Sequence, residues 1–185
     1  MSEASPDDPW KRCFLALAPD AASRDALAAL DVPLNARRVP YEQLHLTVAF
    51  IGQLPRETGA MLAERLQSDA FTIPPASVTK IECWPSRMHP RLMVAVLEMS
   101  EAFAGLNRRV RSLMEEAGLP LDARAFRPHI TLARFARDAQ ETALARDGIP
   151  ALPPLNFTSL VLYSSTLARQ GARYDALASV ALKRA

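Results

Sequence analysis

The sequence has few residues of the kind that bind metals or form disulfides. Its 185 residues include two cysteines, Cys13 and Cys83, and three histidines. The cysteines do not form a C-x-x-C pair, so neither a disulfide framework nor a cysteine-based metal site is expected. Each cysteine lies in an apolar, strand-like run, which favours a buried free thiol. We therefore predict a protein without a metal or another cofactor.

Long apolar runs and nucleotide-binding loops are also missing. No stretch approaches the roughly 20 apolar residues that a membrane-spanning helix needs, and the acidic start MSEASPDDPWKR lacks the apolar core of a secretory signal. Neither G-x-x-x-x-G-K-[ST] nor G-x-G-x-x-G occurs. With 49% hydrophobic and 23% charged residues, the composition is that of a globular protein of about one domain, expected in the cytoplasm.

Lysine is scarce, with three residues against 19 arginines, and the net charge is only +2. That charge is too small to indicate a polyanionic partner by itself. Guanidinium groups suit phosphate better than ammonium groups do, but a GC-rich genome would also raise arginine, alanine and proline together. Each arginine therefore has to be argued from its position.

Hydrophobic periodicity divides the chain into strands and helices. We predict a disordered leader over residues 1–11 and a single domain of two lobes over 12–185. The predicted strands cover residues 12–18, 37–39, 44–51, 71–73, 78–83, 92–97, 129–135, 155–163 and 174–182. The predicted helices begin after Asp20, at Pro55 and at Ser100, and a fourth covers residues 139–146.

The order of these elements is repeated in the two halves of the chain. Each half runs strand, helix, loop, histidine-containing strand, helix and strand, and His45 and His129 are 84 residues apart. This spacing is too long for a solenoid repeat but suits two related lobes. The sequence therefore predicts an α+β fold. We expect two pseudo-symmetric lobes of mainly antiparallel sheet, with helices packed outside and a central cleft.

Two of the three histidines stand in matching frames, His45-Leu46-Thr47 and His129-Ile130-Thr131. The chain has only eight threonines, so two such matches are not expected by chance. Residues i and i+2 of a strand point to the same face. Each frame therefore places an imidazole beside a hydroxyl, and two lobes that face each other would bring both pairs to one cleft.

Two imidazoles and two hydroxyls suit a particular reaction. One histidine can act as a base and the other as an acid near neutral pH. The hydroxyls can donate hydrogen bonds to the non-bridging oxygens of a phosphate. The natural chemistry is in-line displacement at a phosphodiester without a metal. The alternative is structural: half-buried strand histidines paired with threonines that favour β-structure.

The chain resembles the bacterial RNA 2′,3′-cyclic phosphodiesterases, also called 2′-5′ RNA ligases, of the 2H phosphoesterase superfamily. The likeness extends over about residues 12–183. The resemblance is based on the segments Val39-Pro40, Leu44–Gly52, Phe126–Arg134, Phe14–Leu17, Leu160–Ser165 and Gly171–Tyr174. The resemblance implies a bilobal α+β fold with a central cleft, and opening of an RNA 2′,3′-cyclic phosphate to a 2′-phosphomonoester.

The resemblance also implies roles for individual residues. It makes His45 the proton donor to the leaving 3′ oxygen and His129 the acceptor that activates water. Thr47 and Thr131 would hold the phosphate. The expected partner is RNA with a 2′,3′-cyclic phosphate end, bound by a monomer. Alternatives are an RNA-end-binding module without useful turnover, or a phosphodiesterase of 2′-5′ oligonucleotides or small cyclic nucleotides.

Two arginines beside the second motif are candidate substrate-binding residues. Arg134 follows His129 by five positions, so a regular strand would place it on the opposite face. It reaches the cleft only if the strand bends or ends there. Arg127 precedes His129 by two positions and shares its face. The third histidine, His89, lies in a proline-flanked basic loop, where we expect it to be solvated.

Overall fold

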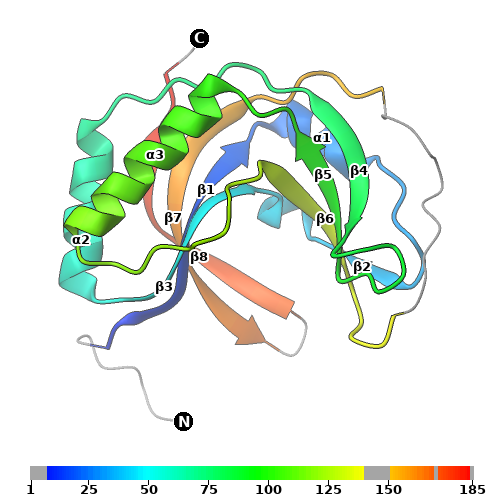
Figure 1. Ribbon diagram of the computed structural model, residues 1–185, viewed down its shortest axis with the longest axis horizontal. Coiled ribbons are helices and arrows are strands. Elements are labelled where there is room, and N and C mark those ends of the chain that lie inside the picture. Colours follow the sequence, from blue (N-terminus) through cyan, green and yellow to red (C-terminus); the bar gives the residue numbers. More distant parts are fainter. Residues whose placement is uncertain (1–7, 140–150, 169–170, 184–185) are drawn as a thin grey trace.

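The computed structural model describes residues 8–139, 151–168 and 171–183 (Figure 1). The described α-helices are α1 (Ala21–Ala28), α2 (Arg56–Ser68) and α3 (Glu101–Glu116), and the described 3-10 turn, η1, covers Tyr41–Gln43. The described strands are β1 (Trp10–Pro19), β2 (Ala36–Arg38), β3 (Leu46–Leu54), β4 (Val78–Trp84), β5 (Leu92–Leu97), β6 (His129–Phe135), β7 (Phe157–Ala168) and β8 (Gly171–Ala181). The predicted helix over 139–146 falls, from residue 140 on, outside the described residues.

The strands form one sheet in the order β4-β5-β6-β3-β1-β7-β8, with β2 added along β6. Every described strand pair is antiparallel. The two central strands, β3 and β6, are joined at one register position, where Leu46 pairs with Ile130. The sheet therefore consists of two halves that meet at a narrow junction, and the predicted α+β fold with mainly antiparallel strands is confirmed.

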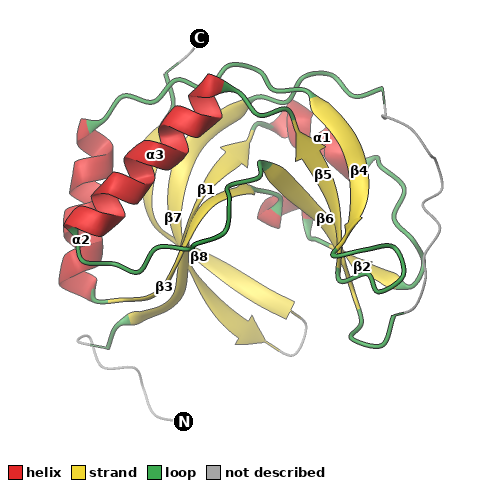
Figure 2. Ribbon diagram, viewed as in Figure 1, coloured by secondary structure: helices red, strands yellow, loops and turns green. Residues whose placement is uncertain are grey.

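The helices cover the outside of these two halves (Figure 2). Helices α2 and α3 pack on each other and on the half that contains β3 and β8. Helix α1 belongs to the other half, where Arg38 of β2 donates hydrogen bonds to the carbonyls of Ala28 and Leu30. This arrangement leaves the opposite face of the junction uncovered by helices.

Helix α3 forms as its sequence predicts. The Ser100 hydroxyl caps the helix by accepting a hydrogen bond from the Phe103 amide. The apolar side chains at three- and four-residue spacing are all buried, namely Phe103, Leu106, Val110, Leu113 and Met114. Gly118 follows with a φ of +67°, the left-handed conformation that ends a helix at little cost in glycine.

The start of the domain differs from the prediction. Strand β1 begins at Trp10, so the predicted leader over residues 1–11 extends too far, and residues 1–7 lie outside the described part. The Trp10 ring packs against Gly59 of α2, where a Cβ would lie 2.4 Å from the indole. The guanidinium of Arg56 lies 5.1 Å from the same ring. Gly59 weakens the helix pattern, but a residue without a side chain is needed at this position for the Trp10 ring to pack.

The predicted strand over residues 71–73 is not formed. Thr72 makes only an isolated bridge to Lys183. Pro74 and Pro75 follow directly and have no amide hydrogen to donate to a neighbouring strand. The segment is therefore held by its side chains, with Phe71 and Ile73 buried in the core.

Candidate active site

The two His-x-Thr frames meet where the halves of the sheet join. Leu46 and Ile130 are fully buried partners in the β3–β6 pair. The residues on either side of them point to the opposite face. Because the pair is antiparallel, its register places His45 beside Thr131 and Thr47 beside His129. Each histidine thus lies next to the threonine of the other motif, and all four side chains are partly exposed.

Both histidines make the same hydrogen bond to their own chain. His45 Nδ1 lies 2.6 Å from the carbonyl oxygen of Gln43, and His129 Nδ1 lies 2.7 Å from that of Arg127. A carbonyl oxygen can only accept, so each Nδ1 carries a proton and each neutral ring leaves Nε2 unprotonated. The two rings are therefore oriented alike, with Nε2 as the atom that can take up a proton.

Burial disfavours protonation of both rings. Loss of solvation lowers the pKa of His45 to about 4, against the opposing effect of its hydrogen bond to Gln43. The positive charges of Arg134 and of protonated His129 lower this pKa further. The pKa of His129 is lowered chiefly by burial, and by the charge of Arg127. The site thus favours two neutral histidines, and a proton on His129 further disfavours a proton on His45.

Several aromatic rings pack around His45, and one packs against His129. The His45 ring centroid lies 5.1 Å from Phe14 and 5.4 Å from Tyr174, and Phe14 also stacks on Tyr163 at 5.3 Å. The His129 ring centroid lies 4.4 Å from Trp84. These contacts explain why residues on a cleft face are so strongly desolvated.

Arg134 reaches the same face as His129 because β6 contains a bulge. Ala133 pairs with Met93 and Thr131 with Val94, so β6 has one more residue than β5 between these two pairs. The extra residue reverses the alternation, which leaves Ala133 buried and Arg134 exposed beside the motif. The bend that the sequence analysis requires for Arg134 is thus present.

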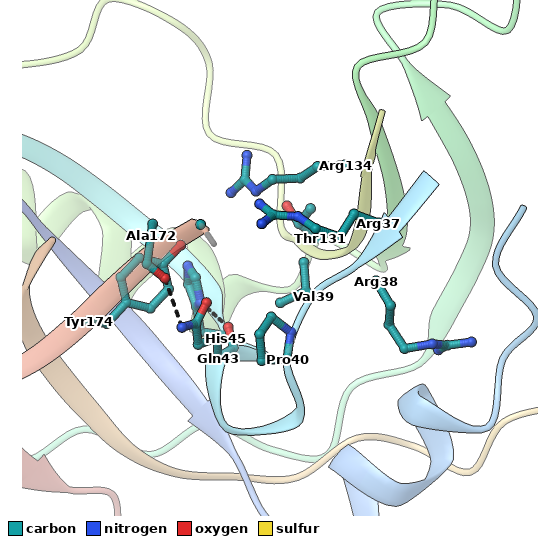
Figure 3. Close-up of a pocket in the computed structure, with 11 residues that line it drawn as sticks. Arg37, Arg38, Val39, Pro40, Gln43, His45, Thr131, Arg134, Ala172 and Tyr174 are labelled. Carbon is teal, nitrogen blue, oxygen red and sulfur yellow. Dashed lines mark hydrogen bonds between the residues drawn. The ribbon is translucent and has the colours of Figure 1, made fainter. Parts of the chain in front are cut away.

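A cavity of about 120 Å³ opens between the two halves of the sheet (Figure 3). It contains His45, Thr131 and Arg134 of the predicted set. His129 and Thr47 are not among these lining residues, and His129 packs against Trp84 instead. The described residues that line the cavity are Arg37, Arg38, Val39, Pro40, Gln43, His45, Thr131, Arg134, Gly171, Ala172 and Tyr174.

Arg127 lies in a second hollow of about 400 Å³ beside β4, which Trp84 and Glu82 also line. Its guanidinium lies 4.4 Å from the centre of the Trp84 ring and 3.5 Å from a carboxylate oxygen of Glu82. Glu82 also accepts a hydrogen bond from the indole nitrogen. Arg127 is therefore held against Trp84, outside the first cavity. His89 is exposed in its loop, as predicted.

The structure adds residues that the sequence analysis does not select. Arg37 and Tyr174 line the cavity, and Gln43 donates a hydrogen bond to the carbonyl of Ala172 in β8. Gln43 also supplies the carbonyl that orients His45. Only pairing between distant strands brings these positions together. The one available signal is that Ala172 and Tyr174 lie in Gly171–Tyr174, a segment that carries the family resemblance, whereas Arg37 and Gln43 lie outside those segments.

Metal ligands do not gather anywhere in the part of the chain that the structure describes. Those residues contain no group of three His, Cys, Asp or Glu side chains that could hold a metal ion. Cys13 and Cys83 are buried free thiols, as predicted, and burial raises the pKa of Cys13 to about 11. Among the described helices, none is long and apolar enough to cross a membrane.

A family model places this site in a known group of proteins. Residues 18–164, which include both motifs, match the model of the 2′-5′ RNA ligase superfamily. The chain belongs to this superfamily. The predicted family resemblance is thereby confirmed.

Individual relatives agree with that assignment. Proteins named RNA 2′,3′-cyclic phosphodiesterase from Aeropyrum pernix and Escherichia coli are 28% and 29% identical. The first match covers 86% of this chain and 93% of the relative, and the second covers 81% and 82%. The structure of E. coli LigT complexed with 3′-AMP has a TM-score of 0.75 at 26% identity, over 95% of this chain and 99% of that one. A Thermus thermophilus protein has a TM-score of 0.70 at 27% identity, over 92% and 97%.

Proposed function

We propose that this chain is an RNA 2′,3′-cyclic phosphodiesterase that hydrolyses a terminal 2′,3′-cyclic phosphate to a 2′-phosphomonoester. The observation that carries the proposal is the meeting of the two His-x-Thr frames on one face at the β3–β6 junction. Membership of the 2′-5′ RNA ligase superfamily and curated relatives named for this activity support it.

The proposed step displaces the 3′ oxygen from phosphorus. A water oxygen bonds to phosphorus while the bond from phosphorus to the 3′ oxygen breaks. The water proton passes to Nε2 of His129, and Nε2 of His45 gives a proton to the departing 3′ oxygen. The 2′ oxygen stays bound to phosphorus, so the product is a 2′-phosphomonoester. The Nδ1–H groups remain hydrogen-bonded to Arg127 and Gln43 and keep each ring oriented.

His45 must be protonated to serve as the acid, although burial and nearby charges disfavour protonation of its ring. An anionic phosphate beside the ring favours the imidazolium and offsets the positive charge of Arg134. Substrate binding thus prepares the acid. Arg134, Thr47 and Thr131 hold the non-bridging oxygens, where negative charge grows in the transition state.

We further propose that residues 12–185 act as one bilobal domain and as a monomer. The sheet runs without interruption from β4 to β8 through the junction, which favours a single folded unit. The cleft is lined from both halves of one chain, so no second copy is needed to complete it. We also propose that the protein acts in the cytoplasm, which is consistent with an RNA substrate.

The test is product analysis on an oligonucleotide that ends in a 2′,3′-cyclic phosphate. The expected product is a 2′-phosphate, resolved chromatographically from the 3′ isomer. Activity is expected to survive EDTA, because proton transfer and phosphate binding are assigned to side chains. Loss of activity on chelation, restored by one divalent ion, would contradict the two-histidine mechanism. Tight binding of the cyclic end without turnover would instead indicate an RNA-end-binding module.

A further inference from the structure

Two arginines stand side by side at the mouth of the cavity. Arg37 of β2 and Arg134 of β6 are direct partners across the antiparallel pair, and both are exposed. Figure 3 shows their guanidinium groups extending in the same direction, over Thr131 and toward the β8 segment at Ala172. Like charges directly opposite each other on a sheet are destabilising. Guanidinium groups match phosphate oxygens in geometry and charge, so two neighbouring arginines suit an anionic ligand.

Arg37 also reaches the other half of the sheet. A Cβ added to Gly171 would lie 2.6 Å from Nη1 and 3.0 Å from Nη2 of Arg37. The guanidinium therefore lies directly against the start of β8, in space that any other residue at position 171 would fill. Gly171 has a φ of +125°, which also favours glycine. Arg37 thus crosses the cavity from β2 to the β7–β8 hairpin.

The two arginines have different neighbours. Arg134 lies close enough to His45 for its charge to lower the pKa of that ring, so it is placed for the reacting phosphate. Arg37 extends to Gly171, at the edge of the cavity. None of the described residues that line this cavity is acidic. The lining therefore offers a second cationic position beyond the one that serves the reacting phosphate.

An RNA substrate carries a second negative charge at one nucleotide from its cyclic end. We propose that Arg37 binds the phosphodiester that precedes the terminal nucleotide, and so selects RNA ends over mononucleoside 2′,3′-cyclic phosphates. This inference rests on the proposed function. A mononucleoside cyclic phosphate has a 5′-hydroxyl in place of that phosphodiester, so it leaves Arg37 without its ligand.

The chain provides a matched control in the neighbouring residue. Arg38 is equally exposed, but its guanidinium donates hydrogen bonds to the carbonyls of Ala28 (3.0 Å) and Leu30 (2.7 Å), at the end of α1. Figure 3 shows it directed away from Arg37 and Arg134. Arg38 also lines the cavity, but its guanidinium is held near the end of α1, so removing it deletes the same charge from the same strand away from the Arg37 guanidinium.

The experiment measures kcat/KM on three substrates: a mononucleoside 2′,3′-cyclic phosphate, a dinucleotide with a 2′,3′-cyclic end, and that dinucleotide with an uncharged methylphosphonate linkage. A hydrogen bond to a charged group contributes enough for Arg37→Ala to lower kcat/KM on the charged dinucleotide roughly 10- to 100-fold. The other two substrates are expected to change less than about two-fold, which also shows that the variant is folded. Arg38→Ala should leave the preference between substrates unchanged.

The outcomes separate this inference from the proposed function. Equal losses on all three substrates would overturn the inference, because Arg37 would then act at the reacting phosphate. A kcat/KM of Arg37→Ala on the charged dinucleotide that equals the wild-type value would overturn it too. In both cases hydrolysis by the wild-type protein leaves the proposed function intact. If the wild-type protein opens none of the cyclic phosphates, the proposed function fails, and with it the inference.

Discussion

His45 shares its cavity with Thr131, the threonine of the other motif. This crossed arrangement follows from the antiparallel register around Leu46 and Ile130. In the proposed mechanism, one phosphate held at the junction is therefore contacted from both halves of the sheet. The two motifs form a single unit, and neither can hold the phosphate in the proposed way alone.

The first prediction concerns the histidine pair. A general acid or base contributes roughly 10²- to 10⁴-fold, so His45→Ala and His129→Ala should each lower kcat by at least about 10²-fold. The double variant should lose much less than the product of the two losses, because the groups act as a unit. His89→Ala, in the exposed loop, is the matched control and should retain wild-type kcat. A motif histidine whose variant keeps near-wild-type turnover would be structural.

The second prediction concerns Trp84, which covers His129. Burial lowers the pKa of His129, and the Trp84 ring contributes to that burial. Trp84→Ala should expose the imidazole and raise its pKa toward the ordinary value of about 6.5. Trp84→Phe keeps an aromatic cover and should keep the pKa low. NMR titration of the His129 ring protons measures both. An unchanged pKa in Trp84→Ala would show that other groups desolvate the ring.

Most of the fold is predictable because its patterns are local. The apolar spacing after Ser100 predicts α3, and the alternation from His129 to Phe135 predicts β6 with its observed bounds. Tertiary contacts decide where the prediction is wrong. Trp10 is held in β1 because its ring packs closely against Gly59 of α2. The local sequence around Trp10 does not predict that contact.

The candidate site is predictable only in part. Strand periodicity pairs each histidine with its threonine, but the crossed relation of the two motifs depends on the β3–β6 register. The position of Arg134 depends on the bulge at Leu132 and Ala133, which becomes visible only in the pairing of β6 with β5. Arg37 enters the cavity through its pairing with Arg134, and a single sequence does not reveal such partners.

The third prediction links His45 to stability. Burial holds its pKa at about 4 in the folded protein, below the unfolded value near 6.5. Between these pH values the unfolded chain binds a proton that the folded chain does not. The free energy of unfolding is therefore undiminished by His45 above about pH 6.5, and it decreases as the pH falls toward 4. A shift of this size corresponds to about 3 kcal/mol when the loss is complete.

The measurement is the free energy of unfolding in urea between pH 7.5 and pH 4.5. Wild-type protein and His89→Gln should lose stability more steeply over this interval than His45→Gln, which has no imidazole to protonate at this position. Parallel curves for the wild type and His45→Gln would contradict a strongly lowered pKa for His45.

The last prediction concerns Arg134, which the β6 bulge places in the lining of the cavity. Its guanidinium lies beside His45 and Thr131, so Arg134→Ala should weaken substrate binding and raise KM. Each phosphate contact with single-stranded nucleic acid contributes a slope of roughly 0.7 to the dependence of log affinity on log salt. The variant should therefore show a salt dependence that is shallower by about that amount. Arg124→Ala is the control, because Arg124 is exposed and ion-paired with Asp122 outside the cavity. If KM and the salt slope stay at wild-type values in Arg134→Ala, the arginine is an ordinary surface charge and the bulge serves only the packing of β6 on β5.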